Sequence, residues 1–308
     1  MHFSPKKPLK IGTRSSPLAL AQAEETKTRL IASSGFASDC FEIVPMSTKG
    51  DRNLSQNLSD IGGKGLFTED LEAAMFGGAI DIAVHSMKDM PIVLPEGLII
   101  QCYLPREDVR DGFISKKYHS IYDLPDGATV GTSSLRRTAQ VLAKRPDLNI
   151  AAFRGNVQTR LKKLDDGVAD ATFLACAGLN RLGLASTAIP IDPKDMMPAV
   201  AQGAIGIEQR TDDDDVTDLL AGINDADTTI RILAERAFLT GLDGSCQTPI
   251  ASYTELSGDK LTLFGEVLRP DGSEVLSGTR SGIAADAVEM GADLAREIRA
   301  LMRADFFE

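Results

Sequence analysis

The chain has 308 residues, a formal net charge of −11, 43% hydrophobic residues and 25% charged residues. This composition is typical of a soluble globular protein with two or three domains, and the negative charge argues against general binding to nucleic acids or anionic membranes. No stretch reaches about 18 uninterrupted apolar residues. The opening MHFSPKKPLKIG lacks the apolar core of a secretion signal, so we expect a cytoplasmic protein.

The first hundred residues alternate between strand-like and helix-like segments. Residues 9–13 are typical of a strand, and the helix expected after them has Pro17 at its first position, with Ser15 or Ser16 as the cap. A second helix is expected at 67–78, and further strands at 40–46, 79–86 and 97–104. This alternation predicts an α/β fold with mainly parallel sheets.

A second, similar cycle starts near residue 128. Strands are expected at 128–134, 148–156 and 169–179, and helices follow the first two. ATVGTSSLRRTAQVLA resembles LKIGTRSSPLALAQAE of the first cycle, so we expect two similar α/β lobes, each with a helix N-terminus at the carboxyl end of a strand. After about residue 223, a helix, three strand-like runs and a closing helix predict a small α+β unit.

Two arginines begin the helix expected after GTSS. Arg136 and Arg137 fall in its first turn, where a positive charge opposes the helix dipole at a cost of about 0.3–1 kcal/mol. Free N–H groups and hydroxyls at a helix N-terminus form an anion site. Adjacent helical residues diverge by about 100°, so we expect the two guanidinium groups to bind different carboxylates. The alternative is that one or both turn to an Asp or Glu on a neighbouring element.

Charged residues also end other strands. Five strand ends carry a charge, namely Arg14, the pair Lys88 and Asp89, the pair Arg136 and Arg137, Arg154, and Arg181. In α/β sheets ligands bind beyond the carboxyl ends of strands. Residues 131–164 hold eight Lys or Arg against one Asp, which indicates a small anionic ligand; the alternative is a solvated basic face.

Lys64 lies in the glycine-rich run DIGGKGLF, residues 60–67. The run lacks the GxxxxGK[ST] spacing of a phosphate-binding loop. It indicates either a mobile loop or a plain turn before a helix.

The cysteines differ in their settings. None of the four stands in a CxxC pair, and only three histidines are present, which argues against disulfides, a zinc site and Cys–His catalysis; we expect no metal. Cys102 and Cys176 lie in core-like strands, and Cys40 opens a strand. Cys246 lies in the loop TGLDGSCQTPIA, so it is the candidate for a covalent anchor, although an isolated loop cysteine often has no role.

Seven segments, in their order and spacing, resemble the porphobilinogen deaminase (hydroxymethylbilane synthase) family: GTRSSPLALAQ, GGKGLF, DIAVHSMKDMP, GTSSLRR, RGNVQTRL, AGLNRLG and GSCQTPIA. The resemblance implies two lobes similar to those of periplasmic binding proteins and a smaller α+β domain that carries the cysteine. The implied domains are 1–104 with 199–217, 105–198, and 223–308.

The family resemblance also implies the reaction. Four porphobilinogen molecules would be joined head to tail, with release of four ammonia, to give hydroxymethylbilane for tetrapyrrole (haem) biosynthesis. Cys246 would hold a dipyrromethane cofactor through a thioether, and that cofactor would prime the growing chain. Loss of ammonia leaves an electron-poor azafulvene, whose cationic character an ionised carboxylate would stabilise.

Roles for individual residues follow from the same resemblance. Asp89 would be the catalytic carboxylate. Besides Cys246, the residues implied for the cofactor or the growing chain are Ser86, Lys88, Thr132, Ser134, Arg136, Arg137 and Arg160. The residues implied for the incoming substrate or the growing chain are Arg14, Ser16, Gln22, Lys64, Arg154 and Arg181.

Two other functions fit parts of the sequence. A two-lobed carboxylate sensor or solute-binding protein would explain the lobes and the arginines, but the sequence shows neither a signal segment nor a DNA-reading helix. A cysteine-dependent transferase acting on another acid lacks a histidine beside its cysteine. On the favoured interpretation the protein is a monomer that acts on a small molecule and binds neither nucleic acid nor a membrane.

Overall fold

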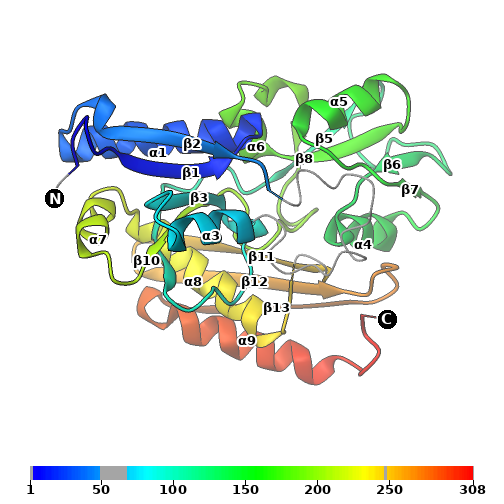
Figure 1. Ribbon diagram of the computed structural model, residues 1–308. Coiled ribbons are helices and arrows are strands. Elements are labelled where there is room, and N and C mark those ends of the chain that lie inside the picture. Colours follow the sequence, from blue (N-terminus) through cyan, green and yellow to red (C-terminus); the bar gives the residue numbers. More distant parts are fainter. Residues whose placement is uncertain (1–2, 49–67, 246–247, 308) are drawn as a thin grey trace. The chain divides into compact units, whose positions relative to one another are not determined.

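The computed structural model describes residues 3–48, 68–245 and 248–307 (Figure 1). The chain divides into two compact units, the first made of residues 1–106 and 204–229 and the second of residues 107–203 and 230–308. Each unit therefore contains two separate stretches of sequence. Among the described residues, no helix is both long and apolar enough to span a bilayer.

The first unit contains a five-stranded sheet in the order β2-β1-β3-β10-β4. Its strands are β1 (Leu9–Arg14), β2 (Phe41–Met46), β3 (Ile82–Ser86), β4 (Leu98–Tyr103) and β10 (Ile205–Arg210). β1 is parallel to β2 and β3, whereas β10 is antiparallel to both β3 and β4. The predicted α/β class is confirmed, and the sheet is mixed because the returning segment enters it in the opposite direction.

Helices cover both faces of this sheet. They are α1 (Pro17–Ser34), α3 (Glu69–Phe76) and α7 (Asp214–Ala221), with a 3-10 turn η1 (Ser38–Cys40) before β2. Ser16 caps α1, its hydroxyl accepting a hydrogen bond from the Ala19 N–H at 3.3 Å, and Pro17 is the first helical residue. Ser16, rather than Ser15, is thus the cap.

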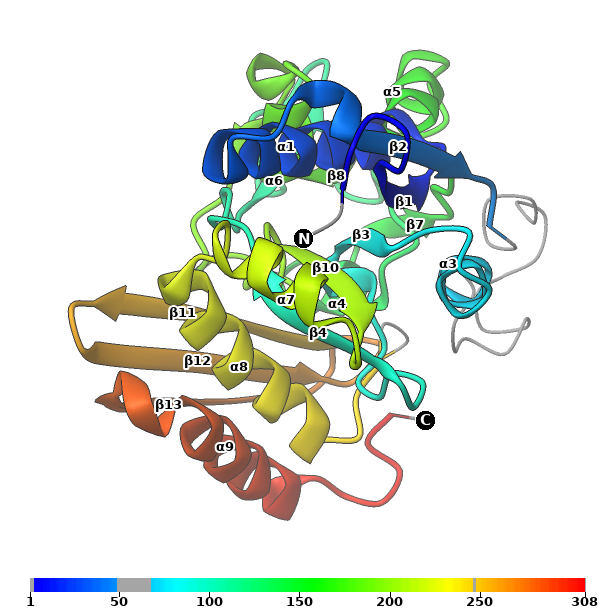
Figure 2. The same cartoon turned by 60° about the vertical axis from the view of Figure 1, so that its left-hand side comes forward.

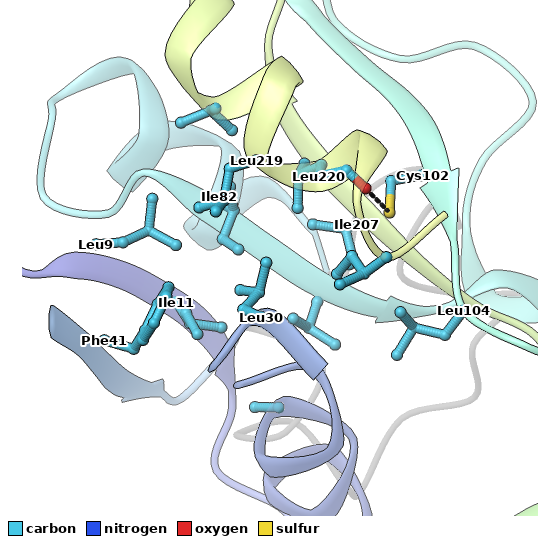
Figure 3. Close-up of a cluster of buried hydrophobic side chains, with 14 of the residues drawn as sticks. Leu9, Ile11, Leu30, Phe41, Ile82, Cys102, Leu104, Ile207, Leu219 and Leu220 are labelled. Atoms are coloured by element: carbon cyan, nitrogen blue, oxygen red, sulfur yellow. Dashed lines mark hydrogen bonds between the residues drawn. The ribbon is translucent and has the colours of Figure 1, made fainter. Parts of the chain in front are cut away.

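The core of the first unit lies between α1, α7 and one sheet face (Figure 3). Ile82 of β3 packs there with Leu30 of α1 and Leu219 of α7. Ala83, the next residue of β3, belongs instead to a second cluster with Leu71 of α3. Because successive side chains of a strand point to opposite faces, α3 covers the other face.

The second unit contains a sheet of the same topology, in the order β7-β6-β8-β5-β9. Its strands are β5 (Asp111–Ser115), β6 (Thr129–Gly131), β7 (Asn149–Ala151), β8 (Ala171–Ala175) and β9 (Ile189–Pro190). β6 is parallel to β7 and β8, and β5 is antiparallel to β8 and β9. The corresponding order in the first unit is β2, β1, β3, β10 and β4, so the two predicted lobes are indeed similar.

Three helices pack on this second sheet, α4 (Leu135–Lys144), α5 (Val157–Asp165) and α6 (Cys176–Arg181), with a 3-10 turn η3 (Ala185–Thr187) after them. Phe113 and Phe173 of adjacent strands meet edge to face at 5.8 Å and share a cluster with Val141 of α4. Leu174 faces the opposite side, with Leu164 of α5. α4 and α5 therefore lie on opposite faces.

The second unit also holds an antiparallel three-stranded sheet, β11 (Ile250–Ser257), β12 (Lys260–Leu268) and β13 (Val275–Ile283). α8 (Ala226–Gly241) and α9 (Ala287–Leu301) lie along this sheet, with a 3-10 turn η4 (Ala284–Asp286) before α9 (Figure 2). A Cβ at Gly265 would come within 2.6 Å of Phe238 of α8 and 2.9 Å of Leu294 of α9, so only glycine permits both helices to pack this closely. The predicted α+β segment is confirmed.

The boundaries of the units differ from the domains expected from the sequence. The return of the chain to the first unit begins at Ala204 rather than 199, and the unit extends to Thr229 rather than 217. The α+β segment belongs to the same compact unit as residues 107–203. The division into three domains therefore remains a prediction.

Candidate active site

In the first unit, a tight turn presents Lys88 and Asp89. β3 ends at Ser86 and is followed by a 3-10 turn, η2 (Met87–Asp89). Met87 is buried, and its N–H donates to the Ala204 carbonyl at 3.0 Å. This hydrogen bond, together with the burial of Met87, holds the turn in place. Lys88 is half-buried and Asp89 is exposed at the end of the strand.

Helix α1 contributes a second group at the same tip. Gln22 is buried, and its Nε2 donates to Ser86 Oγ at 2.8 Å. Arg14 is the last residue of β1, and β1 and β3 are parallel with Ile11 opposite Ile82. Parallel strands end at one edge, so the structure brings six predicted residues to this edge of the first unit: Arg14, Ser16, Gln22, Ser86, Lys88 and Asp89.

In the second unit, α4 starts at a hydroxyl-lined turn. Ser134 is the N-cap, and its Oγ accepts from the Arg137 N–H at 3.4 Å. The Ser134 N–H in turn donates to Oγ1 of Thr132, which is buried, at 3.2 Å. The first turn of α4 contains no carboxylate, so the positive end of the helix is not offset within the helix itself.

Arg136 and Arg137 do not diverge toward different carboxylates as the sequence suggested. Both are only 4% exposed, and both bind Asp111, whose Oδ2 lies 2.7 Å from Arg136 Nη2 and whose Oδ1 lies 2.6 Å from Arg137 Nη2. The expectation was wrong because β5, which begins at Asp111, places a fully buried carboxylate within reach of both side chains. The alternative pairing with a neighbouring acid is the one present in the structure.

Asp111 is held ionised by this pair. Burial alone would raise its pKa, but the two guanidinium groups and their hydrogen bonds outweigh burial and hold the pKa of Asp111 well below its ordinary value. Burial lowers the pKa of Arg136, and the charge of Asp111 opposes that effect. Two cations thus share one buried anion.

Three further arginines of the second unit lie near the ends of its parallel strands. Arg154 follows β7 and is half-buried, and its Nη1 is buried with no hydrogen-bond partner among the described residues. Arg160 of α5 donates from Nε to the Gly155 carbonyl at 3.0 Å. Arg181, at the end of α6, places both Nη atoms 3.3 Å from the Gly203 carbonyl. All three are half-buried.

Cys246 and Lys64 lie outside the described residues. Two hydrogen bonds join Ser245, before the cysteine, to Thr248, two residues after it. The Ser245 N–H donates to Thr248 Oγ1, and that hydroxyl donates to the Ser245 carbonyl, both at 2.8 Å. A Cβ at Gly244 would lie 2.5 Å from Leu239 and Ile250 side-chain atoms. Gly244, two residues before the candidate anchor, is therefore closely packed, whereas Ser245 is exposed.

The other three cysteines are buried and free. Burial raises the pKa of Cys102 to about 12 and that of Cys176 to about 11. Thiols of this kind are poor nucleophiles at neutral pH, in agreement with the core positions expected for them.

The sequence did not identify two buried acidic residues that contact predicted site residues or their neighbours. Asp111 binds the arginine pair, and Glu208 of β10 places Oε2 2.9 Å from Nε2 of buried His85, the residue before Ser86. A charged residue inside an otherwise apolar strand is the signal that would have found both, as in REDVRDGFIS and GAIGIEQR.

The arrangement is suited to a ligand with several carboxylates. Arg136 Nε, Arg137 Nε and Arg154 Nη1 are buried donors without a partner in the described part of the chain, and a buried donor left unsatisfied favours a bound acceptor. Hydroxyls and helix N–H groups lie beside them. No group of three potential metal ligands occurs among the described residues. The residues present fit a polyanionic cofactor such as dipyrromethane.

Several solved structures are similar in backbone structure to part of this chain. A TRAP periplasmic solute binding protein from Desulfovibrio salexigens has a TM-score of 0.44 and 12% sequence identity, covering 72% of this chain and 73% of that chain. A putative methionine-binding lipoprotein from Bacillus subtilis has a TM-score of 0.43 and 16% identity, covering 73% of this chain and 93% of that chain.

Two family models match the sequence. "Porphobilinogen deaminase, dipyromethane cofactor binding domain" matches residues 9–218, and "Porphobilinogen deaminase, C-terminal domain" matches residues 229–300. A porphobilinogen deaminase from Paracoccus denitrificans (strain Pd 1222) is 61% identical over 305 residues, which cover 99% of this chain and 97% of that protein. These matches favour the enzyme over the sensor, and the chain belongs to the porphobilinogen deaminase family.

Proposed function

We propose that Asp89 is the catalytic carboxylate with which this transferase condenses four porphobilinogen molecules into hydroxymethylbilane. The observation that carries the proposal is the turn after β3, where buried Met87 anchors an exposed Asp89 beside half-buried Lys88. An exposed carboxylate on a fixed turn can meet a ligand without moving the sheet. Catalytic groups held on rigid elements cost little reorganisation during the reaction.

Bound dipyrromethane supplies the free pyrrole carbon from which chain growth starts. Cys246 would hold it through a thioether. The residues that would bind its carboxylates and those of the growing chain are Ser86, Lys88, Thr132, Ser134, Arg136, Arg137 and Arg160. The Nε atoms of Arg136 and Arg137, which are buried and have no partner within the part of the chain that the structure describes, support this assignment.

The incoming porphobilinogen carries one acetate and one propionate. Arg14, Ser16, Gln22, Lys64, Arg154 and Arg181 are the residues that we assign to it or to the growing chain. A charge-assisted hydrogen bond between a guanidinium and a carboxylate contributes about 1.5–3 kcal/mol. Arg154 Nη1 is buried and has no hydrogen-bond partner among the described residues, which is the observation that supports this assignment most directly.

Asp89 acts on the cation that forms when porphobilinogen loses ammonia. The bond between the methylene carbon and the protonated amine breaks, and the bonding electron pair leaves with the nitrogen as ammonia. The Asp89 carboxylate accepts a hydrogen bond from the pyrrole N–H and offsets the positive charge on the ring. Each cycle would add one pyrrole to the bound chain and release one ammonia, the proton of the free ring carbon being lost as the new carbon–carbon bond replaces the carbon–nitrogen bond.

The protein would work as a cytoplasmic monomer without a nucleic acid or membrane partner. The net charge of −11 supports this proposal, because a protein of that charge is repelled by nucleic acids and by anionic lipid surfaces. Size-exclusion chromatography with light scattering measures the mass in solution, and a dimer mass would contradict the proposed monomer.

Intact-protein mass spectrometry tests the proposed anchor. The protein purified from cells that make porphobilinogen should carry the added mass of two pyrrole units. Cys246→Ser should have the bare mass, whereas Cys40→Ser, which changes a buried cysteine, should keep the addition. An addition that survives in Cys246→Ser would remove Cys246 from its proposed role.

A further inference from the structure

Asp111 is the centre of a buried polar cluster inside the second unit. It is fully buried at the start of β5 and accepts three side-chain hydrogen bonds. Arg136 Nη2 and Arg137 Nη2 lie 2.7 and 2.6 Å from its two oxygens, and Gln202 Nε2 lies 3.1 Å from Oδ1. Each guanidinium group thus uses one of its two Nη atoms to bind the same carboxylate.

The second Nη atom of each arginine also donates a hydrogen bond. Arg136 Nη1 donates to the Met197 carbonyl at 2.7 Å, and Arg137 Nη1 donates to the Phe173 carbonyl at 2.8 Å. The Nε atoms of both arginines are buried without a partner among the described residues. The cluster of two arginines and one aspartate has a net charge of +1 and two unused donors.

Two buried guanidinium groups would lower the stability of a chain that does not yet carry the cofactor. A buried cation is costly unless an anion accompanies it. Burial, and to a smaller extent repulsion by Arg137, lower the pKa of Arg136. We take the dipyrromethane of the proposed function to be built from porphobilinogen after the chain has folded. The arginines must therefore be buried before any cofactor carboxylate can neutralise them.

We infer that Asp111 is an internal counter-ion, a positioning residue that allows the Arg136–Arg137 pair to be buried in the bare chain before the cofactor binds. The inference rests on the proposed contact of these arginines with cofactor carboxylates. Asp111 and the cofactor then stabilise the same two cations, and the two anions repel each other in a low-dielectric interior. Each should therefore matter more to the stability of the unit when the other is absent.

Asp111→Asn tests this coupling through thermal unfolding. Bare protein is prepared in a host that cannot make porphobilinogen, and a portion is loaded by adding porphobilinogen, with loading measured by intact mass. Breaking a buried ion pair should lower the Tm of the bare variant by roughly 6–20 °C. Loading should then raise the Tm of Asp111→Asn by about 3 °C or more beyond the rise seen in the wild type.

Glu235→Gln is the matched control. Glu235 is a fully buried acid of the same unit, whose oxygens accept from the Ala201 N–H and the Thr254 hydroxyl. Its loss should lower the Tm of the bare and the loaded protein equally. An equal loss in Asp111→Asn, or a greater loss in the loaded form, would overturn the inference, because a merely structural residue behaves in that way.

Two further variants separate this inference from the proposed function. Asp111→Glu keeps the charge, so its loading shift should equal that of the wild type even if both forms are less stable. If bare Asp111→Asn is unfolded, bare Asp111→Glu should still show the far-UV circular dichroism of a folded chain, and unfolding of both bare variants would count against the inference. If Arg137→Gln loads with the wild-type rise in Tm, the proposed contact of that arginine with the cofactor fails, whatever Asp111→Asn shows.

Discussion

Gln22 Nε2 lies 2.8 Å from Ser86 Oγ, so helix α1 is joined directly to the tip of β3. The sequence assigned these two residues separately, Gln22 to the substrate and Ser86 to the cofactor. Their contact indicates that they act as one unit, because a change in either leaves the other without its partner.

A double-mutant cycle on this pair is the first prediction. Gln22→Met and Ser86→Ala should each lower kcat/KM for porphobilinogen by roughly 2–10-fold, the loss expected for one hydrogen bond. Since each single change already breaks the contact, the double variant should be no slower than the slower single variant. Steady-state kinetics measure all four proteins, and losses that multiply would show that the residues act independently.

Thr26→Val is the control for that cycle. Thr26 lies one turn further along α1, is fully buried, and donates to the Gln22 carbonyl rather than to Ser86. The substitution should lower stability by about 1 kcal/mol and leave kcat/KM close to that of the wild type.

Asp89→Asn is the second prediction. The amide keeps the size of the carboxyl group but cannot offset a positive charge, so kcat should fall by roughly 10²–10³-fold. Asp39→Asn is a matched control, because Asp39 is also exposed and also lies in a 3-10 turn of the first unit. Both variants should unfold at the wild-type temperature. Near-normal turnover by Asp89→Asn would exclude Asp89 as the catalytic carboxylate.

The sequence predicted the repeated architecture well. Both lobes were inferred from two similar strand–serine–helix openings, and these became β1 with α1 and β6 with α4. The local signals were strong, since Pro17 follows a serine cap and Ser134 caps α4. The strand directions were predicted less well, because β5 and β10 pair through contacts distant in sequence and no local pattern reveals that they run antiparallel.

Side-chain pairing at the site was predicted less well than residue identity. Arg136 and Arg137 were expected to bind different carboxylates, but both bind Asp111, which is 25 and 26 residues away in sequence. Helical geometry places two side chains about 100° apart, yet long flexible arginines can still converge on one oxygen pair. The deciding factor was the place of Asp111 in the sheet, which depends on tertiary structure.

The third prediction concerns acid. The folded pKa of Asp111 lies below its unfolded value of about 3.9, so its ionised form stabilises the fold above that pH. This stabilisation is lost as the pH falls through the lower, folded pKa. The difference in unfolding free energy between wild type and Asp111→Asn should be constant from about pH 7 to pH 5 and should shrink below about pH 4. Urea unfolding at several pH values measures it.

The comparison is made as a difference because another buried acid has the opposite effect. Burial raises the pKa of Glu266, so its contribution to stability is present below its unfolded pKa and is lost as the pH rises through its folded pKa. Because Glu266 also interacts electrostatically with Arg136, both proteins are compared in a Glu266→Gln background, so that this contribution is absent from the difference. A difference that grows at low pH would show that Asp111 is not held ionised by Arg136 and Arg137.

Thiol labelling provides the fourth prediction. Cys40, Cys102 and Cys176 are buried, and with pKa values of about 12 and about 11 the last two hold almost no thiolate at pH 8. Iodoacetamide should therefore label the native bare chain once, at Cys246, and should label the loaded chain not at all, because a thioether sulfur has no thiolate to react. Intact mass before and after treatment counts the labels.

The labelling result separates an anchor from an accessible thiol without a role. If the loaded protein still takes up one label at Cys246, the added pyrrole mass is attached elsewhere and the proposed thioether is wrong. If native bare Cys246→Ser takes up a label, one of the three buried cysteines is reached by the reagent, and the loss of that label on loading would no longer identify Cys246. Urea-unfolded bare protein should take up four labels, one for each cysteine of the chain, so the expected rise from one to four measures how completely the fold protects the other three.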